Sequence, residues 1–258
     1  MKQPPDLAAR RAVLLRWAFI VLFVLMLEAL CRTGVIGKQT MIPPSAMLVA
    51  LVQALASGAV THDALVTLQN VGAAFVASVI GGFVAGAAIH ALPRLRRVLE
   101  PLFASYYAVP TFVFYPVLLA VFGMNDLPII AIGTLFGVVA VIVATLNGLD
   151  RIPPALRKTA RVLRMSPLAT VLKLQLPAIA PHLFTGVKLA IAYSFIGVIA
   201  AEFILSDRGL GYAISYAYNN FDNRRMYALM LLIILVVASV NAVFLGWERR
   251  LARRRGLA

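Results

Sequence analysis

The chain has 258 residues, of which 62% are apolar and 13% are charged, and its mean hydropathy is +0.90. Soluble domains are about 45–50% apolar and about 25% charged, so this composition excludes a water-soluble globule. The formal net charge is +14, but the basic residues lie between apolar runs and follow no single amphipathic face, so we expect no nucleic-acid partner.

Six long apolar runs follow one another along the chain. A helix rises about 1.5 Å per residue and the hydrocarbon core of a bilayer is about 30 Å thick, so about 20 apolar residues cross it. The runs predict an all-α membrane protein with about six transmembrane helices, at Val13–Leu30, Val66–Leu92, Leu102–Phe122, Leu127–Leu149, Phe184–Leu205 and Met226–Trp247. We interpret the first run as a retained span and not as a signal peptide, because Leu30 precedes Cys31 where a cleavage site needs a small residue.

The basic residues predict the orientation of these helices. Of the 24 lysines and arginines, 18 lie in the connections and termini on one side of the predicted membrane and 5 lie on the other. Cytoplasmic loops carry the excess of Lys and Arg, so both termini are predicted to be cytoplasmic. We therefore expect a basic cytoplasmic N-terminal segment (residues 1–16), a transmembrane domain (17–248) and a basic cytoplasmic tail (249–258).

The inner connection at residues 150–177 is long and contains its own helix signals. Pro153 and Pro154 suit the first turn of a helix. Apolar residues then recur at i, i+4 and i+7 among basic residues, as Leu156, Ala160 and Leu163, which predicts a short amphipathic helix. Ser166 and Pro167 repeat the start signal, and Pro177 is expected to close a second helix.

This connection also carries a recognisable motif. The run Lys158-Thr159-Ala160, then Arg164, then Leu174-Gln175-Leu176-Pro177 resembles the cytoplasmic loop of binding-protein-dependent ABC importer permeases, whose pattern is E-A-A, three residues, G, nine residues, I-x-L-P. The spacing holds throughout. The sequence departs from the pattern at Lys158, which replaces Glu, at Thr159, which replaces Ala, and at Arg164, which replaces Gly.

Other segments resemble the nitrate/sulfonate/taurine branch of that family over residues 42–248. They are Ile42-Pro43-Pro44-Ser45, Ser57-Gly58 with His62 and Thr67-Leu68, the spaced set Pro110, Pro116 and Phe122-Gly123, and the stations Gly186-Val187-Lys188, Ala201-Glu202 and Gly209-Leu210-Gly211. Gln69 and Asn70 depart from the branch, which commonly has basic residues there.

The resemblance implies the fold of a type I ABC importer transmembrane domain in the cell inner membrane. It implies a permease subunit that forms the path for a small solute together with a second permease subunit, with a homodimer favoured. A periplasmic solute-binding protein would deliver the solute, and a cytoplasmic ABC ATPase dimer would bind ATP and Mg²⁺. The coupling loop that meets the ATPase would comprise Leu156, Lys158, Thr159, Ala160, Leu163, Arg164, Ser166, Pro167, Leu174, Leu176 and Pro177. The alternative for this loop is an interfacial helix that binds only anionic lipid.

Two further groups of residues are candidates for the solute path. Pro110 and Pro116 would kink the third span and bring Tyr107, Phe112 and Tyr115 toward a path, although a kink needed only for packing is an open alternative. Lys188 and Glu202 are the ionisable residues of the fifth run, each about one turn inside an end, so we expect them at the interfaces. Glu28 and Asn241 are expected to make buried polar contacts between helices, and Gly81, Gly82, Ala85 and Gly86 are expected to allow close helix packing.

The sequence offers no sign of catalysis. No nucleophile–base pair and no phosphate-binding loop of the G-x4-G-K-[ST] type occurs, so we expect a transport subunit and not an enzyme, with no cofactor of its own. One cysteine and three histidines exclude an intrachain disulfide and a metal cluster. The alternative functions are a stand-alone secondary transporter, for which we find neither inverted repeats nor midplane charges, and a membrane scaffold without transport.

Overall fold

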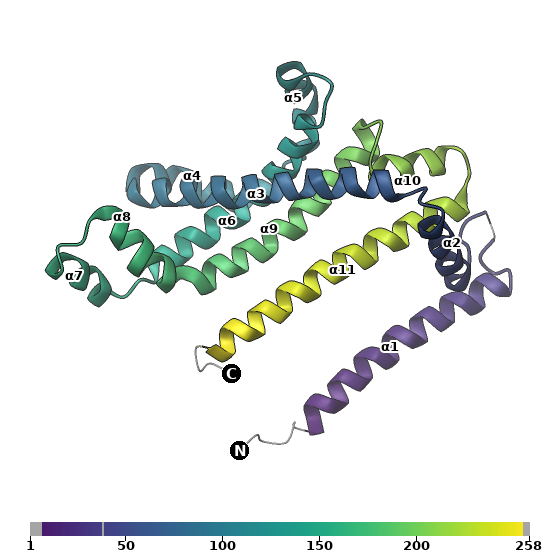
Figure 1. Cartoon of the computed structure of the whole chain (residues 1–258), viewed down its shortest axis with the longest axis horizontal. Coiled ribbons are helices and arrows are strands. Elements are labelled where there is room, and N and C mark those ends of the chain that lie inside the picture. The colour runs from purple at the N-terminus through teal and green to yellow at the C-terminus, as the bar shows by residue number, and fades with distance from the viewer. Residues whose placement is uncertain (1–6, 38, 255–258) are drawn as a thin grey trace. The chain divides into compact units, whose positions relative to one another are not determined.

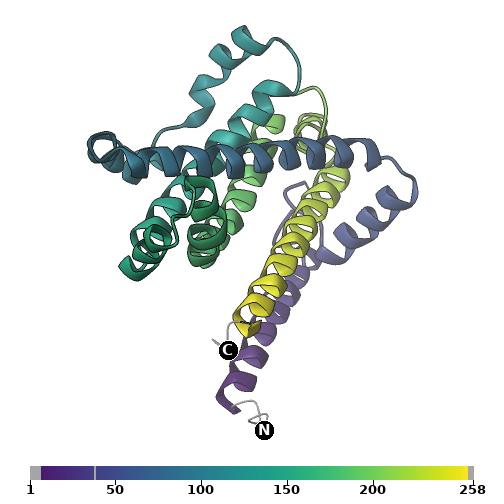
Figure 2. The same ribbon diagram turned by 60° about the vertical axis from the view of Figure 1, so that its left-hand side comes forward.

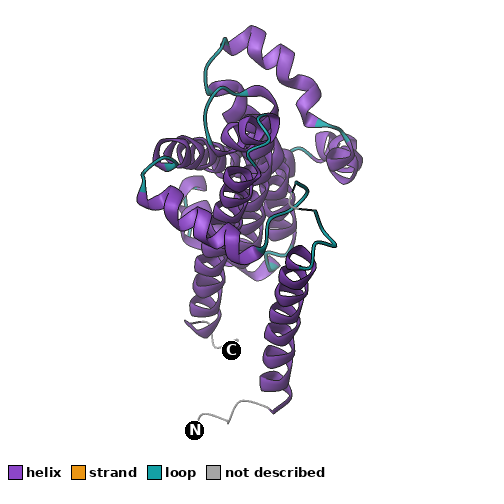
Figure 3. Cartoon of the chain, turned by 90° about the vertical axis from the view of Figure 1, so that its right-hand side faces the viewer, coloured by secondary structure: helices purple, strands orange, loops and turns teal. Residues whose placement is uncertain are grey.

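A computed structural model describes residues 7–37 and 39–254, and every regular element among them is helical (Figure 3). Within these described ranges, five helical segments are long and apolar enough to cross a membrane, namely Leu14–Arg32, Thr61–Ala91, Leu127–Asp150, Val171–Leu205 and Asn223–Glu248. The predicted all-α, multi-pass membrane protein is therefore confirmed.

The elements are labelled in Figure 1. In chain order they are α1 (Leu7–Arg32), α2 (Pro44–Ala56), α3 (Thr61–Ala91), α4 (Pro93–Ser105), η1 (Tyr106–Ala108), η2 (Thr111–Phe114), α5 (Tyr115–Phe122), α6 (Leu127–Asp150), α7 (Pro154–Val162), α8 (Pro167–Thr170), the π-helical turn η3 (Val171–Gln175), α9 (Leu176–Leu205), α10 (Leu210–Asn219) and α11 (Asn223–Arg254).

The prediction of one continuous third span, Leu102–Phe122, is wrong. The structure divides this run among the end of α4, the two 3₁₀ turns η1 and η2, and the eight-residue helix α5. Proline has no N–H to donate and disfavours helical geometry in the residue before it. Accordingly, Val109 is extended, with φ −83° and ψ 122°, directly before Pro110. The second predicted kink, Pro116, instead lies in the first turn of α5. N–H groups in a first turn have no partner within the helix, so a proline there costs no hydrogen bond.

The described residues form two compact units. The first contains the residues up to 61 together with 213–234, and the second contains 62–212 and the residues from 235 onward. The predicted division at residues 16 and 248, which is by side of the membrane, stays a prediction, and the helices α1 and α11 continue without a break across these two positions.

In the first unit, Glu28 joins the end of α1 to the start of α2. Its carboxylate accepts hydrogen bonds from Ser45 Oγ at 2.6 Å, from the Ser45 backbone N–H at 2.9 Å and from Arg32 Nε at 2.6 Å. The Ser45 N–H is one of the first-turn donors of α2, which has no partner within its own helix. The predicted polar contact of Glu28 between helices is thus present, but the residue is half-buried and not buried as predicted. The predicted burial of Asn241 is wrong, because that residue is exposed.

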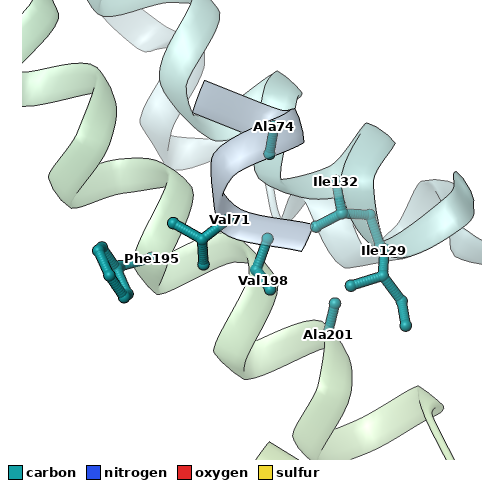
Figure 4. Packing of buried hydrophobic residues seen from close by; sticks show 7 residues of the cluster. All are labelled: Val71, Ala74, Ile129, Ile132, Phe195, Val198 and Ala201. Carbon is teal, nitrogen blue, oxygen red and sulfur yellow. The ribbon is translucent and has the colours of Figure 1, made fainter. Parts of the chain in front are cut away.

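The core of the second unit lies where α3, α6 and α9 meet. Val71 and Ala74 of α3 pack against residues of α6 and α9 in one buried cluster (Figure 4), completed by Ile129, Ile132, Phe195, Val198 and Ala201. The backbones of α6 and α9 approach closely at Gly133 and Gly197. A Cβ added to Gly197 would lie only 2.9 Å from the Cα of Gly133. Small residues permit such contact in membrane helices. As predicted, Gly82 and Gly86 are buried against α6, but Gly81 is exposed.

Helices α6 and α9 run side by side, and the connection between them folds back at one end of the pair (Figures 1 and 2). This connection holds α7, α8 and η3, as the sequence predicted for residues 150–177. The predicted end of the second helix at Pro177 is wrong. Pro177 lies instead in the first turn of α9, and the chain continues as helix from α8 through η3 into that helix.

Candidate functional site

One side of α7 packs onto the body of its own chain. Leu156 contacts a buried cluster formed by Leu149, Ile152 and Ile179, and the side chain of Ala160 is only 6% exposed. The sequence predicted that Leu156, Ala160 and Leu163 would together face a partner. The structure corrects this prediction, because Leu156 packs on the ends of α6 and α9, Ala160 is buried within its own chain, and Leu163 alone of the three remains exposed.

The outward side of α7 is apolar at its end and basic around it. Val162 is 80% exposed and Leu163 is 64% exposed. Lys158, Arg161 and Arg164 are also exposed. Together these five residues form a surface that we call the α7 tip. Thr159, also exposed, donates its hydroxyl back to the carbonyl of Ala155 at 3.0 Å and so stays with its own helix.

The turn that ends α7 has a defined geometry. Arg164 has φ 46°, in the left-handed region. Its N–H donates to the Arg161 carbonyl at 3.0 Å, and the N–H of Met165 donates to the Ala160 carbonyl at 3.0 Å. These two bonds define a Schellman motif, in which the left-handed position is usually glycine. Arg164 stands where the loop pattern described above has its glycine, so this position has the left-handed backbone that favours glycine but carries an arginine.

The rest of the connection forms the far wall of a hollow beside the α7 tip. Ser166 Oγ accepts a hydrogen bond from the N–H of Ala169 at 3.2 Å and so caps the start of α8. The half-buried Leu174 and Leu176 lead into α9. The hollow has a volume of about 430 Å³, and its lining includes Arg161, Arg164, Met165, Thr170, Val171 and Gln175. Pro167 belongs to α8, but its side chain is outside the described ones.

The aromatic candidates for a solute path divide into two groups. Tyr107 is 46% exposed and lines a cavity of about 370 Å³ between α4, α6 and α9, where its ring lies 4.9 Å from that of Tyr193. Phe112 packs instead against Phe136 of α6, at a ring distance of 5.5 Å, and Tyr115 donates its hydroxyl to the Leu205 carbonyl at 3.1 Å. Of these three predicted path residues, Tyr107 therefore lines this cavity, whereas Phe112 and Tyr115 contact α6 and the end of α9.

Two basic residues near this region are held by carboxylates. Lys188 Nζ lies 3.0 Å from Glu248 Oε2 of α11, a partner that the sequence analysis missed. Arg96, which lines the cavity of Tyr107, donates two hydrogen bonds of 2.7 Å to the carboxylate of Asp150. That carboxylate raises the pKa of Arg96 above its ordinary value.

Glu202 is a buried anchor, not an interfacial residue as predicted. It is fully buried, and its carboxylate accepts hydrogen bonds from Thr67 Oγ1 at 2.7 Å, Asn70 Nδ2 at 3.3 Å and the Gly211 N–H at 3.2 Å. Thr67 Oγ1 in turn accepts the N–H of Leu210 at 2.8 Å. The first backbone donors of α10 thus find their partners on α3 and α9. The i, i+3 spacing of two polar residues in an apolar helix was the sequence signal for this network.

The described residues contain no group of three or more His, Cys, Asp or Glu side chains that could hold a metal ion. The candidate functional residues thus lie in three places along α6 and α9. The α7 tip is exposed at one end of the two helices, the cavity of Tyr107 lies beside them, and the buried network of Glu202 lies at their other end.

Comparison with known proteins relates this arrangement to membrane transport. Residues 77–256 match the family described as binding-protein-dependent transport system inner membrane component. The chain is 31% identical over 177 residues to the nitrate import permease protein NrtB of Leptolyngbya laminosa. That alignment covers 69% of this chain and 63% of the relative. It is 28% identical over 190 residues to the bicarbonate transport system permease protein CmpB of Synechococcus elongatus, in an alignment that covers 72% of this chain and 67% of the relative.

A solved structure has a similar fold. A chain of the MetNI methionine ABC transporter, in an inward-facing conformation, matches with a TM-score of 0.55 and 19% sequence identity, over 73% of this chain and 93% of that chain. The chain spans about two thirds of the length of the curated relatives that it matches.

Proposed function

The chain belongs to the family of binding-protein-dependent transport system inner membrane components, and we propose that it is the permease subunit of an ABC importer. In this proposal two permease subunits, by preference two copies of this chain, enclose the path of a small solute. A periplasmic solute-binding protein delivers the solute, and a cytoplasmic ABC ATPase dimer supplies the energy.

The observation that carries this proposal is the exposed α7 tip. The tip is fixed to the ends of two packed long helices, α6 and α9, so a displacement imposed on it would pass directly to these helices. Rigid elements that move together are one way in which a switching event at one site reaches another. The seating of Leu156 and Ala160 on the chain itself makes α7 a firm attachment and not a loose anchor.

The proposed solute is a small anion of the nitrate, sulfonate or taurine type, or a related organic compound. Two relatives carry names of nitrate and bicarbonate transport, which agrees with a small anion. The cavity beside Tyr107 and Tyr193 is the part of the described chain that we assign to the path, because an open cavity with a mainly apolar wall and a few polar groups is typical of solute sites.

The experiment that tests the permease role is a single substitution at the α7 tip. Leu163→Asp should abolish binding of the ATPase and solute uptake while the protein still inserts into the membrane, because a carboxylate would replace an exposed apolar contact. Met124→Asp is the matched control, since Met124 is 94% exposed in the loop between α5 and α6. Full ATPase binding and uptake by the Leu163→Asp variant would reject the assignment of this loop.

A further inference from the structure

The α7 tip carries positive charge that its own chain leaves uncompensated. Lys158, Arg161 and Arg164 are exposed, and none of the ion pairs among the described side chains involves them. The sequence contains no Asp or Glu between Asp150 and Glu202. A partner that covers this surface must therefore either supply negative charge or desolvate several cations without compensation, which is costly.

The arrangement of apolar residues argues against a lipid surface as that partner. A helix that lies in a membrane interface buries an apolar face along its length. In α7 that face, with Leu156 and Ala160, already packs onto the chain itself. Of the large apolar side chains of α7 and the residue that ends it, Val162 and Leu163 remain exposed, side by side at the C-terminal end. A projecting apolar pair surrounded by cations fits a groove in a protein better than a flat layer of lipid.

The backbone holds these cations in place. The Schellman bonds fix the turn at Arg164, and Arg161 and Arg164 both line the hollow between α7 and η3. The hollow, at about 430 Å³, has room for acidic side chains that approach from outside. Guanidinium groups bind carboxylates in a planar, two-bonded geometry that gives both affinity and orientation.

We propose that the surface that receives the α7 tip is acidic: an ABC ATPase groove whose floor takes Val162 and Leu163 and whose rim presents Asp or Glu to Lys158, Arg161 and Arg164. The inference rests on the proposed permease function and adds the chemistry of the partner. An acidic groove also explains the two cations at the Glu and Gly positions of the usual loop. A groove that receives the usual Glu would repel Lys158, whereas an acidic groove attracts both Lys158 and Arg164.

The test measures binding of the purified ABC ATPase subunit of the same transporter to this permease in lipid nanodiscs, at low and at high NaCl. The neutral variant Arg161→Gln/Arg164→Gln should bind at least about tenfold more weakly than the wild type at low salt, and the difference should shrink at high salt. Arg161→Lys/Arg164→Lys, which keeps the charge, should bind more tightly than the neutral variant. An exchange of rim carboxylates for Lys on the ATPase should restore binding to an Arg161→Glu/Arg164→Glu permease.

The outcomes separate this inference from the function on which it rests. Equal binding of the wild type and the neutral variant at low salt would overturn the acidic rim and leave the permease role intact. A wild-type chain that binds no ABC ATPase would overturn the permease role itself. A difference in ATPase binding between the wild type and the neutral variant that appears only in nanodiscs containing phosphatidylglycerol, and not in nanodiscs of uncharged lipid, would assign the cations to lipid and also overturn the inference.

Discussion

Replacing Arg164 with glycine should tighten the turn that ends α7. Arg164 has φ 46°, and a side chain in the left-handed region costs about 1–2 kcal/mol because its Cβ crowds the following carbonyl group. Glycine avoids this cost but loses about 0.5–1 kcal/mol more conformational entropy on folding. The net stabilisation of the turn should be about 0.5–1 kcal/mol, equivalent to about a two- to fivefold change in an opening equilibrium.

The assay should report on this turn and not on the whole membrane protein. Hydrogen exchange followed by mass spectrometry measures local opening, and the N–H groups of residue 164 and Met165 are the donors of the Schellman bonds. In the Arg164→Gly variant these amides should exchange about two- to fivefold more slowly than in the wild type. Arg164→Gln is the matched control, because it removes the charge and keeps the Cβ, and its exchange should resemble that of the wild type.

A second left-handed residue provides an independent repeat. Phe221 has φ 56°, and the turn after α10 has the same two bonds, from the Phe221 N–H to the Tyr218 carbonyl at 3.1 Å and from the Asp222 N–H to the Ala217 carbonyl at 2.9 Å. Phe221→Gly should slow local exchange by a similar factor. If Arg164→Gly exchanges as fast as Arg164→Gln, or faster, the reasoning from backbone strain is refuted.

Two further predictions concern the buried carboxylate and the topology. Glu202→Gln should lower stability by about 1–3 kcal/mol, because an amide cannot accept all three hydrogen bonds and places a donor among donors, and an unchanged melting temperature in detergent would contradict the anchoring role. In a variant without the buried Cys31, a cysteine at Ser206 should react with an impermeant thiol reagent from the periplasmic side, and one at Ala155 only from the cytoplasmic side. The reverse labelling pattern would overturn the orientation predicted from charge.

The sequence alone identified the class of protein and the approximate positions of most of its helices. Long apolar runs become helices in a membrane because no water is present to satisfy the backbone, so run length and composition are sufficient. The third run shows the limit of this argument. Its prolines were visible, but a proline in an apolar run can kink a helix or end it, and here Val109 and Pro110 divide it into short turns.

The spacing of the inner loop likewise identified its helix but not the direction in which that helix faces. The i, i+4, i+7 pattern of Leu156, Ala160 and Leu163 correctly indicated an amphipathic helix. An apolar stripe shows that a face is buried and not what buries it, and the structure turns Leu156 and Ala160 toward the chain itself.

Only the tertiary structure decided which distant residues meet. Thr67 and Glu202 are separated by 135 positions, yet their side-chain oxygens lie 2.7 Å apart, and Lys188 meets Glu248 across 60 positions. Helix formation depends on hydrogen bonds between residues four positions apart, so it can be predicted from local sequence. Contacts between helices depend on how their surfaces fit together, and for α6 and α9 that fit is set by small residues such as Gly133 and Gly197, whose significance appears only once the two helices are side by side.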